Sequence, residues 1–199
     1  MSGLERLTLI NTTPWLADLL ASLCDLDFSR TKEGPIEPIR LADGEPLEMF
    51  AGDASGGAFL FAGRGGEERP VVYAGSEGEG ALVAIGLADA LAVAVELPSL
   101  HDALAVPYGE DGGAALRAWL DRADQEIRDD QPDLDALRGR LREALHLPPA
   151  DGLLERLHAA AADHTYLPVG EHGRYEPMLG TGWVVAVPRE PRSDRSGGS

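Results

Sequence analysis

The chain has 199 residues, of which 44% are hydrophobic, so it can bury a substantial core and global disorder is excluded. Its formal net charge of −17 at pH 7 repels nucleic-acid phosphates and anionic membranes and would attract a basic partner. An acidic balance also serves plain solubility, so charge alone does not distinguish a binding surface from a solvated one.

The location of the protein is suggested by what the sequence lacks. Cys24 is the single cysteine, which excludes an intramolecular disulfide and favours a reducing compartment. Glu5 and Arg6 interrupt the apolar part that a signal peptide would need. Asp89 and Glu96 break the longest apolar segment, so no run of 18 apolar residues spans a membrane. We therefore expect a cytoplasmic protein.

The first predicted element is an amphipathic helix over residues 14–24. Thr13 and Pro14 have the form of an N-cap followed by proline at the first helical position. The predicted buried face of this helix consists of Trp15, Leu16, Leu19, Leu20 and Leu23. A segment punctuated by proline and glycine follows, with a possible short strand at 38–41.

Four short apolar runs then predict an antiparallel meander. They are separated by GDASGG, GRGGEE and GSEGEG, which are rich in residues that tolerate positive φ. Phe59 and Phe61 alternate with Leu60, as in a sheet that is buried on one or both faces. The predicted strands are 47–51, 58–62, 70–74 and 81–85.

Helical periodicity dominates after Gly86. The pattern predicts one helix that ends near Pro98 and further helices whose apolar faces begin at Leu116, Leu134 and Leu153. We expect an α+β fold with a central, mostly antiparallel sheet and a helix-rich C-terminal part. The predicted domain covers 1–188, with a sheet region at about 36–98, a helical region at about 112–165, a strand at 180–188 and a disordered tail at 189–199.

The segment GDASGG invites comparison with two kinds of site. It resembles the GDSGG of chymotrypsin-like proteases, but Ala54 separates Asp53 from Ser55 and every histidine follows the serine. A phosphate loop would need a terminal Gly-Lys-Ser/Thr, whereas the single lysine, Lys32, lies far upstream. The segment is therefore interpreted as a hairpin turn.

Other candidate sites are also weak. The AGSEG around Ser76 superficially matches a nucleophile elbow, but its glycines disfavour the helix that an elbow requires. His164 and His172, with Asp163 and Glu171, are the only possible metal cluster, and their spacing does not place both histidines on one helical face. We expect no metal, no cofactor and no enzymatic activity.

The order of features in PLEMFAGDASGGAFLFAG and RPVVYAGSEGEGALVAIGLADALAVAVELP resembles the SUKH superfamily. The bacterial branch of that family consists mainly of toxin immunity proteins, and its fungal branch includes cell-wall regulators. In the resemblance, residues 53–57 match an acidic-glycine turn, 70–73 a strand with a Pro-Val pair, and 87–97 a helix that closes the sheet. It implies an α+β fold and a non-enzymatic protein that neutralises a toxin, commonly a nuclease or deaminase.

Charge supports that implication in one respect. Residues 41–111 hold 13 acidic residues and only two basic ones, Arg64 and Arg69. Nuclease toxins tend to be basic because they bind nucleic acid, so an acidic surface can steer toward them. The predicted partner-binding residues are Asp43, Glu45, Glu48, Asp53, Glu67, Glu68, Glu77 and Glu79.

Several alternatives stay open at this point. Asp53 has a competing role, which is to hydrogen-bond the backbone of its own turn. The acids of GSEGEG could equally belong to a solvated loop. A structural or regulatory interaction module without a toxin partner is the second functional hypothesis. An enzyme and a nucleic-acid binder are further alternatives; the incomplete catalytic motifs disfavour the first and the acidic charge disfavours the second.

Overall fold

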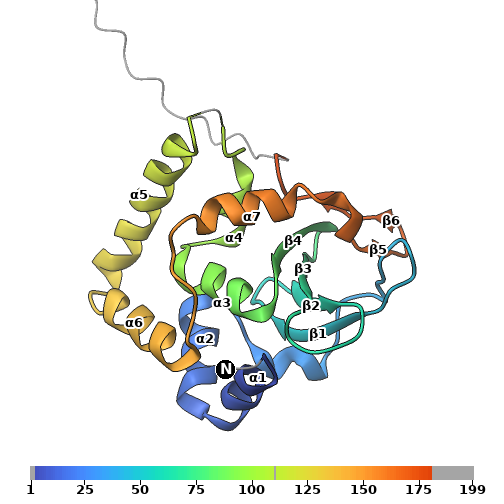
Figure 1. Ribbon diagram of the computed structural model, residues 1–199, viewed down its shortest axis with the longest axis horizontal. Coiled ribbons are helices and arrows are strands. Elements are labelled where there is room, and N and C mark those ends of the chain that lie inside the picture. The colour runs from blue at the N-terminus through green and yellow to red at the C-terminus, as the bar shows by residue number, and fades with distance from the viewer. Residues whose placement is uncertain (1–2, 110, 181–199) are drawn as a thin grey trace, which may run out of the picture.

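The computed structural model describes residues 3–109 and 111–180 (Figure 1). The fold is α+β, as predicted. Its helices are α1 (Gly3–Thr12), α2 (Pro14–Cys24), α3 (Leu87–Glu96), α4 (Leu100–Ala105), α5 (Ala114–Asp130), α6 (Leu134–Leu145) and α7 (Leu153–Ala161), with 3-10 turns η1 (Phe28–Lys32) and η2 (His164–Tyr166). Its strands are β1 (Leu47–Gly52), β2 (Ala58–Ala62), β3 (Pro70–Ala74), β4 (Glu79–Ile85), β5 (Val169–Gly170), β6 (Gly173–Arg174) and β7 (Glu176–Pro177).

The central sheet has the strand order β1-β2-β3-β4-β7. The first four strands form the predicted antiparallel meander, and β7 adds a short parallel edge beside β4. Because the elbow-like AGSEG lies in the turn of the β3–β4 hairpin and not between a strand and a helix, the nucleophile-elbow alternative is wrong.

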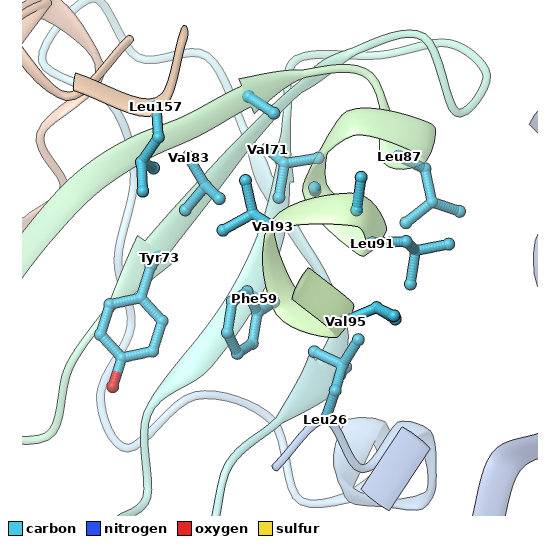
Figure 2. Packing of buried hydrophobic residues seen from close by; sticks show 14 of the residues in the cluster. Leu26, Phe59, Val71, Tyr73, Val83, Leu87, Leu91, Val93, Val95 and Leu157 are labelled. Atoms are coloured by element: carbon cyan, nitrogen blue, oxygen red, sulfur yellow. The ribbon is translucent and has the colours of Figure 1, made fainter. Parts of the chain in front are cut away.

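Both faces of this sheet are covered. On one face, Phe59, Val71, Tyr73 and Val83 pack beneath α3, as Figure 2 shows. The other face carries Leu60, Val72 and Leu82, and the chain before β1 and after α7 covers it. This two-sided burial explains why the strands consist of nearly continuous apolar runs although the sheet is antiparallel.

Helix α2 forms over the predicted residues. Thr13 has extended dihedral angles, Pro14 occupies the first turn, and Asp25 ends the helix in the left-handed region with φ of 49°. The prediction that Trp15 lies in the core is wrong, because its side chain is 42% exposed. At the start of the helix the indole faces outward, where the Arg140 guanidinium lies 4.9 Å from the ring centroid.

The C-terminal helices pack into the same apolar cluster as the sheet. That cluster includes Leu116 and Leu120 of α5, Leu141 of α6 and Leu157 of α7. In Figure 1, α7 lies beside β4, while α5 and α6 lie on the side of α2 and α3 that is away from the sheet.

Some segments differ from the prediction, and others lie outside the described residues. The proposed strand at 38–41 is reduced to isolated bridges from Arg40 to Pro46 and Val169, because Pro38 and Pro46 limit its pairing. Helices α1 and α4 were not predicted. Apart from Gly180, the expected strand at 180–188 and the tail at 189–199 lie outside the described residues.

Candidate functional site

The meander places two hairpin turns at the same end of the sheet. The β1–β2 turn is closed by a hydrogen bond from Asp53 N to Gly57 O of 3.1 Å, and the β3–β4 turn by one from Gly75 N to Glu79 O of 2.8 Å. We call this the turn end. The opposite end, with the β2–β3 connection at 63–69, is the loop end.

Asp53 forms a buried polar network at the turn end. Its Oδ1 accepts hydrogen bonds from Gly57 N and from Ser55 Oγ, both at 2.7 Å. Its Oδ2 accepts one from the Tyr73 hydroxyl at 2.6 Å. The prediction that Asp53 bonds the backbone of its own turn is therefore confirmed, and the same carboxylate also ties that turn to β3.

The network keeps Asp53 ionised. Burial raises the pKa of the Asp53 carboxyl, but the hydrogen bonds from Tyr73, Ser55 and Gly57 outweigh burial and bring that pKa below its ordinary value. Burial and the Asp53 charge together raise the pKa of the Tyr73 phenol far above its usual range. The pair is thus a neutral phenol donating to a buried carboxylate.

A cavity of about 210 Å³ lies beside this network, where the ends of α2 and α3 and the start of α4 meet the turn end. Phe59 and Tyr73, which lie side by side in Figure 2, line it together with Asp53. Across the cavity are Ser22, Leu23, Cys24, Asp25, Ala90, Val93, Ala94, Leu97, Pro98, Ser99, Leu100 and His101.

The cavity carries polar groups without forming a familiar catalytic arrangement. Among the described residues, Ser55 Oγ donates to Asp53 and has no histidine partner. His101 stands edge-on to the Tyr73 ring, with 5.4 Å between centroids, and its Nε2 lies 3.4 Å from Glu79 Oε1. Burial raises the pKa of the Cys24 thiol to about 12, so this cysteine is an unreactive thiol at neutral pH.

An open hollow of about 410 Å³ flanks the turn end on another side. Three segments far apart in the sequence build it: residues 36–37, the β3–β4 turn and the β5–β6 hairpin. Its carboxylates come from Glu37, Glu77 and Glu171, and its basic groups are His172 and Arg174.

Ile36 gives the lining of this hollow an exposed apolar side chain. Its side chain is 69% exposed, the highest exposure among the large hydrophobic residues that the structure describes. It rests on the β1–β2 turn, where a Cβ added at Gly56 would lie 3.4 Å from Ile36 Cδ1. The turn end therefore combines an exposed aliphatic side chain with surrounding carboxylates, a combination suited to contact with a protein.

Glu37 brings the acidic residues of the hollow together. Its Oε2 accepts a hydrogen bond from Glu171 N and its Oε1 one from the Tyr175 hydroxyl, both at 2.9 Å. These bonds, that from Glu171 first, lower the pKa of the Glu37 carboxyl below its ordinary value. Glu37 thus fixes the β5–β6 hairpin against the loop that carries Ile36.

The structure does not bring the eight predicted acidic residues onto one face. Three lie at the turn end: Asp53, which is buried, Glu77, which is exposed, and Glu79, which is partly buried. The remaining five, Asp43, Glu45, Glu48, Glu67 and Glu68, lie toward the loop end. There the exposed Glu48 is paired with Arg69 at 2.7 Å.

Asp53 and Glu67 correct the expectation of an exposed acidic surface, since their exposed fractions are 5% and 3%. Glu67 Oε1 accepts a hydrogen bond from Leu7 N of α1 at 3.0 Å, whereas its Oε2 has no hydrogen-bond partner. Burial is the largest influence on the Glu67 carboxyl and raises its pKa above the ordinary value. Glu67 therefore anchors α1, but burying its side chain costs more free energy when the carboxyl is ionised than when it is protonated.

We expect Glu67→Gln to change the pH dependence of stability. Because the pKa of Glu67 is raised on folding, the contribution of this one carboxyl to stability is fully present below its ordinary pKa and is lost as pH rises through the folded-state pKa. Glutamine can still accept from Leu7 N but cannot ionise. The free energy of unfolding of the variant, measured with urea from pH 4 to 8, should rise relative to wild type as pH increases.

Glu68→Gln is the control for this measurement, since its exposed side chain lies in the same loop. Its difference from wild type should change less with pH. A difference between Glu67→Gln and wild type that is constant with pH would contradict this account of Glu67.

Sequence reasoning missed Ile36 and Glu37 and dismissed Glu171 as part of a weak metal cluster. No local pattern could have found them, because Glu37 and Glu171 meet across 134 positions of the chain and the β3–β4 turn completes the same hollow. Within residues 3–109 and 111–180, no group of three or more His, Cys, Asp or Glu side chains could hold a metal ion. In the same residues, no helix has the length and apolar character needed to cross a membrane.

Comparisons of the chain with protein families, curated proteins and solved structures gave no match.

Proposed function

We propose that the protein is a non-catalytic, cytoplasmic immunity protein that binds a cognate polymorphic toxin of basic, nuclease type. The resemblance to the SUKH superfamily supports this proposal. The chain has a strand, an acidic-glycine turn and a second strand in succession, followed by two more strands and the covering helix α3. That order is compatible with the resemblance.

The observation that carries the proposal is the acidic turn end, where the exposed Ile36 lines the same hollow as three carboxylates. Protein interfaces bind most strongly where an apolar anchor is desolvated and a polar rim surrounds it. Here the rim includes Glu37, Glu77 and Glu171. Their negative charge would speed encounter with a basic toxin and place the protein over a surface that nucleic acid would otherwise occupy.

The loop end is a weaker candidate for the same role. Its exposed carboxylates Asp43, Glu45, Glu48 and Glu68 line neither hollow described above. We therefore assign partner binding to the turn end. Of the eight predicted acidic residues, Glu77 is the one that is exposed there and that we still expect to contact the partner.

The proposal predicts a toxin gene beside the gene for this protein, and co-expression of the two tests it; the absence of such a gene would count against the proposal. We expect this protein to restore growth of cells that express the toxin, and the two chains to co-purify as a soluble complex. Failure of both rescue and complex formation would refute the immunity function and leave the structural or regulatory module. If the Ile36→Asp variant restored growth as well as the wild-type protein does, the assignment of partner binding to the turn end would be refuted.

A further inference from the structure

The cavity beside Asp53 has a charge that its own walls do not neutralise. Asp53 and Asp25 supply two carboxylates, and among the described residues that line the cavity there is no lysine or arginine. The Arg30 guanidinium, which is outside the lining, donates to the Asp53 carbonyl oxygen and pairs with Glu33. Asp53 forms none of the ion pairs that the described residues make.

Both carboxylates are held in place by hydrogen bonds. Asp25 ends α2 in the left-handed region, and its Oδ1 accepts a hydrogen bond from Ala54 N at 2.8 Å. Asp53 is fixed by its bonds to Gly57 and Tyr73. A ligand would therefore meet preorganised negative charge, which lowers the entropic cost of binding.

The remaining wall is apolar and aromatic. Phe59 and Tyr73 form one side, with ring centroids 5.0 Å apart, and His101 stands edge-on to Tyr73. Val93, Ala94 and Leu97 of the α3 region form another side. An aliphatic stem would fit against this wall while a cationic head reaches the carboxylates.

The size of the cavity indicates whether it would hold a small molecule or a single amino-acid side chain. Small-molecule and cofactor sites usually have volumes of about 300–1,000 Å³. The 210 Å³ available here is below that range and is suited to a single long side chain. We propose that this cavity receives one lysine or arginine side chain of the protein partner, with its cationic head against Asp25 and Asp53 and its stem along α3.

This inference rests on the proposed function for the identity of the partner, but the chemistry of the cavity can be tested alone. The probes are n-butylguanidinium and n-butylammonium, which reproduce the ends of arginine and lysine, and n-butylurea, a neutral analogue of the first. Each is titrated into ¹⁵N-labelled protein while the amide resonances of Asp25, Ala94 and His101 are followed by NMR.

We expect saturable shifts of these resonances with at least one cationic probe and much smaller shifts with n-butylurea. The stronger cation identifies whether the cavity prefers arginine or lysine. Asp25→Asn removes one charge while the amide oxygen can still accept from Ala54 N, and asparagine tolerates positive φ. This variant should bind the cation about fivefold more weakly, as expected for loss of one solvent-exposed charge contact.

Two further variants complete the test. Ala94→Leu fills the cavity from α3 and should abolish binding of the probe, with folding checked by the dispersion of the NMR spectrum. Asp18→Asn is the matched control, because it removes one exposed charge from the same helix that Asp25 ends, and it should bind as wild type does. Equal shifts with n-butylurea and both cations, or an unchanged affinity of folded Ala94→Leu, would overturn the inference.

The outcome remains distinct from that of the immunity proposal. If the toxin complex forms but Ala94→Leu leaves its affinity unchanged, the cavity inference fails and the proposed function stands. If no toxin complex forms but the cationic probes bind selectively, the cavity inference stands and the toxin assignment fails.

Discussion

Replacement of Gly57 with alanine is expected to lower the free energy of unfolding by about 3 kcal/mol, through overpacking and the loss of a buried hydrogen bond. A Cβ at this position would lie 2.5 Å from Asp53 Oδ2 and closer still to the Tyr73 hydroxyl oxygen. Displacing either group to make room would break the buried hydrogen bond between them. Denaturation with urea at neutral pH would measure the loss.

Gly66→Ala is the matched control for this result. Gly66 lies in the β2–β3 connection, where an added Cβ would have no neighbour within 4 Å. We expect this substitution to change stability by less than about 0.5 kcal/mol, as is usual for surface sites. Equal stabilities for the two variants would show that the contact of Asp53 with Tyr73 does not restrict residue 57.

Reversal of charge at Glu77 and Glu171 should slow association with a basic toxin by about tenfold or more at low salt. Both side chains are exposed on the rim of the hollow around Ile36, so the double substitution to lysine changes the local field without removing a buried contact. Association rates measured by stopped-flow fluorescence at about 20 mM and 500 mM salt would test this. The difference between variant and wild type should shrink at high salt as screening increases.

Glu126→Lys combined with Asp130→Lys provides a control of equal net charge change. These residues are exposed on α5, one helical turn apart and outside both hollows. If this control slows association as much as the turn-end variant does, total charge and not the turn end governs encounter. If the turn-end variant associates like wild type, the acidic rim has no part in binding.

Strands and main helices were predictable because their patterns are local. Four apolar runs separated by glycine-rich turns correspond to β1–β4, and proline at position 14 marks the start of α2. Predictions failed where packing against distant elements decided the outcome. Trp15 follows the apolar periodicity of α2 yet is exposed beneath Arg140, and the 38–41 segment pairs only at isolated bridges.

The eight predicted acidic residues show the same contrast between what local sequence predicts and what distant packing decides. Composition correctly identified the sheet turns and loops as rich in carboxylates. It could not tell that Glu67 is buried against α1, or that Glu77 lies beside Glu37 and Glu171. Acidic side chains look alike in sequence, and their exposure depends on which segment packs over them.

The stretch GDASGG illustrates what sequence alone determined. Its glycines and its Asp53 define a hairpin turn because the required backbone geometry and the hydrogen bond from Gly57 N are local, and both follow from residue type. Only the tertiary structure decided that Tyr73 completes the network, that the end of α2 and the start of α4 enclose a cavity beside it, and that Ile36 covers the turn. These contacts join residues distant along the chain, so they depend on how the sheet and helices pack and leave no pattern in the order of the amino acids.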